Sequence, residues 1–333
     1  IERVEVEQET IPGQRISLVK EVIRIEGPAP IYVVRKFAPD RPARAPVLLV
    51  HGLAQNRYSW HTSKLSLSAW LVSQGWESWN LELRGHGRGR AEGVNGAERF
   101  DDYVQDALAA LDAIGQPAFC VGHSMGGGVL YGAGSQIAAR GLPVPRGIVG
   151  IGAVYSFART VRLLRVLAWL ARHLPGKSAL GRVQIRTAAA AGPLLLLPRL
   201  ADSAALWAPI SGWWPRSMDP EVLEERLRIG FDWSSLEVWH EMARWSGAES
   251  FDYDEDWQRT DIPVLVMAGD EDHLMPPDEA RVAYDRSGSI DKTFVVMEPW
   301  DHAHHWGHLD LVLGRHAPDH TWTYLDKWMS QRA

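Results

Sequence analysis

The sequence predicts an α/β protein, with a mostly parallel central sheet flanked by helices and a helical segment inserted into it. Short apolar runs typical of buried parallel strands recur along the chain, stretches with helical spacing separate them, and this alternation stops between residues 157 and 261. Strands that alternate with helices form parallel sheets with right-handed crossovers. We therefore predict a core of residues 1–156 and 262–333 and a helical cap of residues 157–261, inserted after the sixth strand.

The predicted elements begin with two β-rich stretches between Arg15 and Phe37. Further strands are expected at residues 46–50, 76–83, 117–121, 148–154, 263–268 and 293–297, and helices at residues 65–74, 101–114, 125–139 and 321–330. The run Pro-Val-Leu-Leu-Val at 46–50 has the continuous apolar character of a strand that is buried on both faces.

The predicted cap has two halves of opposite charge. Residues 157–200 contain eight Lys or Arg and no acid, whereas residues 201–261 contain fourteen Asp or Glu and five Arg. In the first half, Arg159, Arg162, Arg165 and Arg172 alternate with Leu163, Leu167, Trp169 and Leu170. Such a stretch could rest on a membrane or lipid surface as an amphipathic lid. The simpler alternative, which we prefer, is that these arginines pair with the acidic half or face water.

Composition and charge exclude several classes of protein. The chain has 333 residues, of which 46% are hydrophobic and 23% charged, ordinary values for a globular protein. A net charge of −6 provides no basic field to attract nucleic acid, so no nucleic-acid partner is expected. Cys120 is the only cysteine, so neither an intrachain disulfide nor a cysteine-based zinc site can form.

No membrane or targeting segment is expected. The most apolar run, residues 188–198, is shorter than the roughly 20 residues that a membrane-spanning helix needs. The first ten residues are charged and lack a signal-peptide core. A single cysteine is typical of a cytoplasmic protein, which is the expected location. Export is left open, because the sequence begins without a methionine and a leader could have been trimmed.

The strongest motif is Gly122-His-Ser-Met-Gly126, which follows a predicted strand and precedes a predicted helix. This context is typical of a nucleophile elbow, in which a strained turn exposes a serine at the carboxyl edge of a sheet. Small neighbours at Gly122 and Gly126 make such a turn possible. Ser124 is therefore the candidate nucleophile, and the Met125 amide, at the start of a helix, is a candidate donor to an oxyanion.

A second oxyanion donor is expected from the loop after the strand at 46–50, which carries His51-Gly52-Leu53. The Leu53 amide is the best candidate, and the Ala54 amide is the fallback. His51 could instead be a catalytic base, but its place before the turn favours a hydrogen bond to the loop.

An acid and a histidine must follow the serine in this arrangement. Three acids compete in Gly269-Asp-Glu-Asp272: Asp272 lies far enough along the turn to point back over the sheet edge, Asp270 is the runner-up, and Glu271 would point elsewhere. The histidine lies among His302, His304, His305 and His308. Their spacing fits no metal motif considered, so no metal is predicted. His308, in a loop just before the last helix, fits the base, and Asp310 could brace that loop.

These residues resemble the α/β-hydrolase superfamily, and within it the acid lipases and related serine esterases. The similar segments are His51-Gly-Leu53 with Trp60, Ser66-Leu-Ser-Ala-Trp-Leu71, Trp79 with Arg84-Gly85, Gly122-His-Ser-Met-Gly-Gly127, and His308-Leu-Asp-Leu with Ala317-Pro318. The resemblance implies an α/β-hydrolase fold and a triad of Ser124, Asp272 and His308. The cap resembles nothing in the acid lipases, so their substrate class carries over only weakly.

The function expected from these residues is cleavage of a carboxylic ester through an acyl-enzyme, without cofactor or metal. Ser124 disfavours dehalogenase and epoxide-hydrolase chemistry, which use Asp, and polyester synthesis, which uses Cys. Acyltransferase, perhydrolase and C–C hydrolase activities remain open, as does a non-enzymatic small-molecule receptor of this fold. Eight of the 16 tryptophans fall in the predicted cap, Trp60 follows the oxyanion loop, and Trp300 and Trp306 flank the histidines. Indoles around a site mouth would suit a hydrophobic ester.

Overall fold

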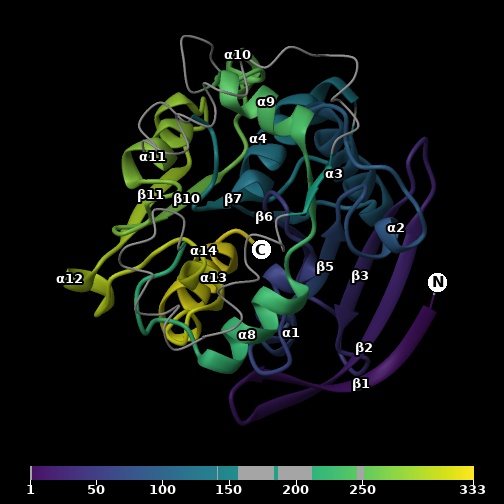
Figure 1. Ribbon diagram of the computed structural model, residues 1–333, viewed down its shortest axis with the longest axis vertical. Helices are drawn as coiled ribbons and strands as arrows, with labels where there is room; N and C mark the ends of the chain where they lie inside the picture. Colours follow the sequence, from purple (N-terminus) through teal and green to yellow (C-terminus); the bar gives the residue numbers. More distant parts are fainter. Residues whose placement is uncertain (1, 141, 157–183, 187–211, 246–250) are drawn as a thin grey trace.

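The central feature of the computed structural model is a nine-stranded sheet with the order β1-β2-β3-β5-β4-β6-β7-β10-β11. The structure describes residues 2–140, 142–156, 184–186, 212–245 and 251–333. The strands are β1 (Glu2–Ile11), β2 (Gln14–Ile25), β3 (Ile31–Phe37), β4 (Pro46–Val50), β5 (Glu77–Glu82), β6 (Phe119–His123), β7 (Gly147–Ile151), β10 (Val264–Gly269) and β11 (Lys292–Met297). Strands β5 through β11 in that order pair in parallel, and β1, β2 and β3 extend the sheet antiparallel at one edge (Figure 1). The predicted mostly parallel sheet is confirmed.

Strand β1 was missed, because the predicted elements began at Arg15. It is an edge strand in which Val4 and Val6 alternate with charged residues, and such alternation is typical of a half-buried strand. Val6 packs against Leu18 of β2. The segment of residues 157–261 therefore follows the seventh strand of the chain, β7, and not the sixth.

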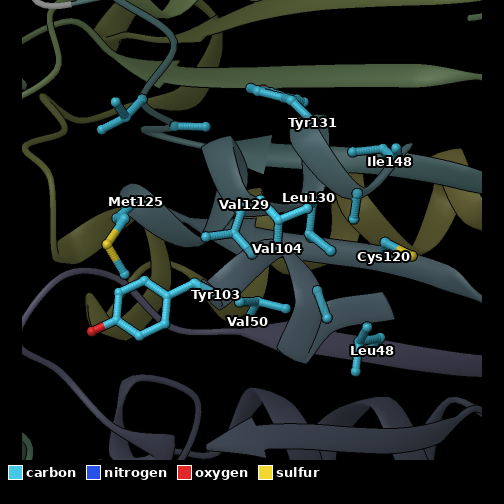
Figure 2. Packing of buried hydrophobic residues seen from close by; sticks show 14 of the residues in the cluster. Leu48, Val50, Tyr103, Val104, Cys120, Met125, Val129, Leu130, Tyr131 and Ile148 are labelled. Atoms are coloured by element: carbon cyan, nitrogen blue, oxygen red, sulfur yellow. The ribbon is translucent and has the colours of Figure 1, made fainter. Parts of the chain in front are cut away.

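Helices cover both faces of the sheet. The helices of the core are α1 (Leu67–Ser73), α2 (Gly87–Ala91), α3 (Phe100–Ile114), α4 (Met125–Arg140), α11 (Pro277–Arg286), α12 (Pro299–His302), α13 (Asp310–Leu313) and α14 (Thr323–Ser330), with short turns η1 (Arg57–Ser59) and η2 (Pro318–Trp322). Side chains of β4 alternate between the two faces: Leu48 and Val50 join one core cluster, and Val47 and Leu49 join the other. Figure 2 shows the first cluster, in which residues of α3 and α4 pack over β4, β6 and β7.

The described part of residues 157–261 contains helices and a short two-stranded sheet. It comprises β8 (Gln184–Arg186), α8 (Pro220–Ile229), β9 (Trp233–Ser235), α9 (Leu236–Arg244) and α10 (Asp254–Trp257). Asp219 begins α8 by accepting hydrogen bonds from two amides of the first turn, and Pro220 stands at its first position. The basic stretch with Arg159, Arg162, Arg165 and Arg172 lies outside the described residues. Among the described residues, no helix combines the length and the apolar character needed to cross a bilayer.

The parallel strands determine where chemistry can occur. Strands β4, β6, β7, β10 and β11 run in the same direction, so their carboxyl ends meet at one edge of the sheet. Gly52 follows β4, Ser124 follows β6, Gly152 follows β7 and Asp272 lies just past β10. Residues that are more than 200 positions apart in the sequence are therefore brought to one place.

Candidate active site

Ser124 lies on a tight turn between β6 and α4. Its φ of +56° is a left-handed conformation, which costs a non-glycine residue of order 1 kcal/mol. The backbone of the turn is held on both sides: the Ser124 amide donates to the carbonyl of Ile151 (3.0 Å), and the Ser124 carbonyl accepts from the amides of Gly127 (3.0 Å) and Val154 (3.1 Å). Within residues 121–130, Ser124 alone is not buried. The strained turn thus leaves the serine accessible at the sheet edge.

Two glycines of the motif are required by close contacts with backbone. A Cβ atom on Gly122 would lie 2.4 Å from the carbonyl oxygen of Gly126, and a Cβ on Gly126 would lie 2.2 Å from that of Val50. Real Cβ atoms do not come so close to backbone oxygens, so any larger residue would displace the elbow from β4. These contacts explain why the motif requires glycine at both positions.

His308 and Asp272 form a buried pair. The Nδ1 atom of His308 lies 2.7 Å from Oδ2 of Asp272, and the two side chains are 3% and 0% exposed. The other oxygen of Asp272, Oδ1, accepts from the amides of Leu274 (2.9 Å) and Met275 (2.8 Å). These amides fix the carboxylate in the turn after β10, so it can hold one edge of the imidazole in a defined orientation.

The pair lies against the elbow. His123, which directly precedes Ser124, donates from Nε2 to the carbonyl oxygen of His308 at 3.0 Å, and the two imidazole centroids are 4.5 Å apart. Burial lowers the pKa of His123 well below its ordinary value, and the neighbouring His308 lowers it further, so His123 is neutral at pH 7. The structure thus places the pair of His308 and Asp272 against His123, the neighbour of Ser124, and the three residues predicted as a triad come from three different loops.

Gly152 occupies the space beneath the histidine–aspartate pair, a position that sequence analysis missed. Its φ is +50°, and a Cβ on it would lie 3.0 Å from both Asp272 Oδ2 and His308 Nδ1. A left-handed glycine after β7 is visible in the sequence only as one of 30 glycines, so no local signal singles it out.

We expect Gly152→Ala to lose turnover as well as stability. The left-handed backbone costs alanine about 1 kcal/mol, and the added methyl group pushes the imidazole and the carboxylate apart. Gly115→Ala is the matched control: its φ is +67°, but its added Cβ meets only the Asp112 carbonyl, at 3.8 Å. Chemical denaturation should show a loss of stability for both variants, larger for Gly152→Ala because of the added contact, and ester turnover should fall only in Gly152→Ala. Equal turnover in the two variants would contradict the placement of Gly152.

Asp270, the runner-up for the triad acid, has different partners. Its carboxylate lies 2.6 Å from Nδ1 of His305 and accepts from the amide of Trp306 at 2.8 Å. Glu271 lies 3.5 Å from Nε2 of His273. Asp270 therefore anchors the loop that leads to His308, and it does not contact His308 itself.

The candidate oxyanion residues belong to the loop after β4 and to the start of α4. A Cβ on Gly52 would come within 2.9 Å of the Ser124 Cβ, so the loop after β4 passes directly beside the serine and carries the Leu53 amide with it. The fallback residue, Ala54, has a φ of +57° and is buried. The Met125 amide is at the first position of α4, where an N–H group has no acceptor within the helix. That both amides serve as oxyanion donors stays a prediction.

His51 is a structural residue of the oxyanion loop. It is fully buried, its Nδ1 donates to the carbonyl of Gly52 (2.9 Å), and its Nε2 accepts from the amide of Leu83 (3.3 Å). Burial lowers the pKa of His51 well below its ordinary value, with a further contribution from His86. Both ring nitrogens are occupied by backbone, which is inconsistent with a catalytic base.

Asp310 braces the histidine loop, as its position suggested. The buried side chain accepts, through Oδ2, from the amides of Gly307 (3.0 Å) and Trp214 (3.3 Å). Burial raises the pKa of this carboxyl to about 7. The residue therefore joins the loop of His308 to the segment that precedes α8.

Asp310→Asn should change the pH dependence of stability. An aspartate in an unfolded chain ionises near about pH 4. Because the folded-state pKa is raised to about 7, the unfolded state binds fewer protons between these values, and the free energy of unfolding falls as pH rises. The variant cannot ionise at this position. In urea unfolding, we therefore expect its free energy of unfolding to rise relative to that of wild type from about pH 4 to about pH 7. Parallel pH profiles for the two proteins would contradict this.

The four histidines between residues 302 and 308 separate into different environments. His308 pairs with Asp272, His305 pairs with Asp270, and His304 stacks on His316 with ring centroids 3.7 Å apart. In the described part of the chain, one group could hold a metal ion: the ligand atoms of Asp270, Glu271 and His305 lie within 4.8 Å of one another. A cavity of about 330 Å³ adjoins this loop, and Trp214, His305 and His316 contribute to its wall.

Most of the described tryptophans belong to the core. Buried indoles are those of Trp60, Trp76, Trp79, Trp213, Trp245, Trp257, Trp306, Trp322 and Trp328. Trp300, by contrast, is 90% exposed, and Trp169 and Trp207 lie outside the described residues. The prediction that the tryptophans gather around a site mouth is therefore wrong for Trp60 and Trp306, which fill the core behind the loops that they adjoin.

Comparisons with known proteins agree with this fold. Part of the chain is 31% identical over 107 residues to a monoacylglycerol lipase of Mycolicibacterium smegmatis (30% of this chain, 36% of the relative). It is also 31% identical over 117 residues to epoxide hydrolase B of Mycobacterium tuberculosis (35% of this chain, 31% of the relative). The chain thus spans about a third of the length of the curated relatives it matches.

Solved structures resemble the whole chain. A monoacylglycerol lipase of Paleococcus ferrophilus superimposes with a TM-score of 0.59 at 17% identity, covering 91% of this chain and 99% of the other. An esterase of Thermogutta terrifontis gives 0.54 at 18% identity, with 94% and 99% covered. At these identities the likeness shows the fold alone.

A sequence model described as the alpha/beta hydrolase family matches residues 47–314, from β4 to the end of the histidine loop and α13. The match includes the elbow, the turn after β10 and the loop of His308, and it covers well over half of the 333 residues. The chain therefore belongs to the alpha/beta hydrolase family.

Proposed function

We propose that this protein is a serine hydrolase that cleaves a carboxylic ester through an acyl-enzyme. The observation that carries the proposal is the buried contact between His308 Nδ1 and Asp272 Oδ2, at 2.7 Å, beside a serine in a left-handed turn. Each of these features costs free energy in a protein that does not use it, because burial of a polar pair and backbone strain are both unfavourable.

The proposed mechanism assigns one role to each group. His308 takes the proton of Ser124 as the hydroxyl attacks the ester carbonyl, and later gives it to the leaving alcohol. Asp272 holds the imidazole in the required tautomer and stabilises its cation. The amides of Leu53 and Met125 donate to the oxyanion, and each such donor contributes about 3 kcal/mol. Water, activated by His308, then hydrolyses the acyl-enzyme.

The nature of the nucleophile supports ester cleavage over epoxide opening, although one relative is named an epoxide hydrolase. A carboxylate that opens an epoxide forms an ester, whose carbonyl water can attack. Ser124 would form an ether, which offers water no carbonyl and would leave the enzyme alkylated. With an ester substrate, the same serine forms an acyl-enzyme that hydrolysis can resolve.

We also propose that residues 157–261 form a cap over this site. Support comes from the residues that follow α8, which contact the oxyanion loop: the amide of Asp232 donates to the carbonyl of Ala54 at 2.7 Å.

The hydrophobic character of the ester stays a prediction, and the burial of most described tryptophans weakens the argument for it. Stopped-flow hydrolysis of p-nitrophenyl esters from C2 to C16 tests both chemistry and preference. We expect a burst of p-nitrophenol equal to the enzyme concentration and faster turnover with longer chains; no hydrolysis of any ester contradicts the proposal.

A further inference from the structure

Arg226 of α8 is a buried cation that contacts no acidic side chain among the residues the structure describes. Its side chain is fully buried and its guanidinium lies 4.7 Å from the centre of the Phe231 ring. Nη2 donates to the hydroxyl of Ser59 at 3.5 Å, whereas Nε and Nη1 have no hydrogen-bond partner within the described residues. Burial lowers the pKa of Arg226 to about 9, which still leaves it protonated at pH 7. Such a group destabilises the fold, because the charge loses its hydration and gains no carboxylate partner among the described residues.

The guanidinium faces the oxyanion loop through a chain of polar contacts. Ser59, which accepts from Arg226, donates in turn from its hydroxyl to Oε1 of Gln55 at 2.7 Å. A Cβ on Gly52 would lie 3.2 Å from that Oε1 and 2.9 Å from the Cβ of Ser124. Only a glycine backbone therefore separates the Gln55 side chain from the serine. The donors along the chain all point from Arg226 toward the loop that carries the Leu53 amide.

The end of α8 also holds this loop directly. Asn56 Nδ2 donates to the carbonyl of Ile229 at 2.8 Å, and Gln55 forms a β-bridge with Phe231. The positive charge of Arg226 acts on two histidines near the serine. Burial is the main cause of the lowered pKa values of His51 and His123, and the charge of Arg226 lowers both pKa values further. These histidines immediately precede the oxyanion loop and Ser124.

We propose that Arg226 is a positioning residue for the oxyanion hole, where its uncompensated charge and its contact with Ser59 favour the negatively charged tetrahedral state over the neutral ester. The proposal rests on the proposed ester hydrolysis. A carboxylate partner for Arg226 would cancel its field at the substrate oxygen, so the absence of a partner among the described residues is part of the arrangement. The buried charge of Arg226 thus destabilises the fold but stabilises the anionic tetrahedral state of the reaction.

The test is Arg226→Met, which keeps the length of the side chain and removes its charge. We expect kcat for a p-nitrophenyl ester to fall by about 10-fold, because the lost positive charge no longer stabilises the oxyanion at an effective dielectric of about 20. KM should stay nearly unchanged, because the interaction arises only in the transition state. The melting temperature should stay equal or rise, because an apolar side chain replaces an unpaired buried charge. Arg226→Lys should recover part of the lost kcat.

Arg35→Met is the matched control, because Arg35 is an arginine with partners: it contacts Glu77 at 2.7 Å and Glu21 at 3.0 Å. It should lower the melting temperature and leave kcat unchanged. A boronic acid, which forms an anionic tetrahedral adduct with serine, should bind Arg226→Met about 10-fold more weakly, in parallel with kcat. Unchanged kcat, or a fall in kcat accompanied by a lower melting temperature and unchanged boronate affinity, would overturn the inference. Wild-type protein that fails to react with a fluorophosphonate would instead overturn the proposed ester hydrolysis itself.

Discussion

Ser124→Ala is expected to lower kcat for ester hydrolysis by about 10⁶, the loss typical of removing a triad nucleophile. Without the hydroxyl, no acyl-enzyme forms, and only binding and the oxyanion donors remain to assist attack by water. The fold should tolerate the change, because alanine meets the same left-handed φ of +56° that serine already adopts. The measurement is steady-state hydrolysis of the best p-nitrophenyl ester, with the melting temperature recorded for both proteins.

Ser135→Ala serves as the control for Ser124→Ala. Ser135 is also on α4, but its hydroxyl donates to the carbonyl of Tyr131 at 2.8 Å, away from the elbow. Its replacement should leave kcat unchanged. Turnover by Ser124→Ala within tenfold of wild type would show that another group is the nucleophile, or that the hydrolysis does not pass through an acyl-enzyme.

The second large effect concerns the choice between two carboxylates. Asp272→Asn should lower kcat by about 10⁴, because the amide cannot hold His308 in the tautomer that accepts the serine proton. Asp270→Asn should lower kcat by far less, since Asp270 contacts His305 and the Trp306 amide rather than His308. Both substitutions remove one negative charge from the same turn, so each is the isosteric control for the other.

Circular dichroism distinguishes this effect from simple unfolding. Both variants should keep the wild-type spectrum, and only Asp272→Asn should lose turnover by orders of magnitude. If Asp270→Asn loses its turnover and Asp272→Asn retains it, the assignment of the triad acid is wrong.

The sequence predicted those parts of the fold that depend on local patterns. Continuous apolar runs located the parallel strands, and the glycines around Ser124 located the elbow, because each pattern reflects a steric requirement at its own position. Strand β1 was missed although Val4 and Val6 alternate with charges, because an exposed edge strand contains few apolar residues. Helix α11 was missed for a related reason: few of its residues are buried, and among these is Glu279.

Features that depend on long-range contacts could not be predicted. The raised pKa of Asp310 follows from the complete burial of its side chain, which no local sequence pattern indicates. No sequence pattern singles out Arg226, since its burial depends on how α8 meets η1. The tryptophan excess pointed to the site, whereas the structure puts most described indoles in the core, because burial is the common fate of large apolar rings.

The central claim is that Ser124 is a nucleophile activated by His308 and Asp272. Its most direct test is covalent labelling by a fluorophosphonate, followed by mass spectrometry of the intact protein and of its peptides. We expect one adduct per wild-type chain, located on Ser124, with labelling abolished in Ser124→Ala and slowed by several orders of magnitude in Asp272→Asn. Wild-type protein that stays unlabelled, or an adduct on a residue other than Ser124, would contradict the account.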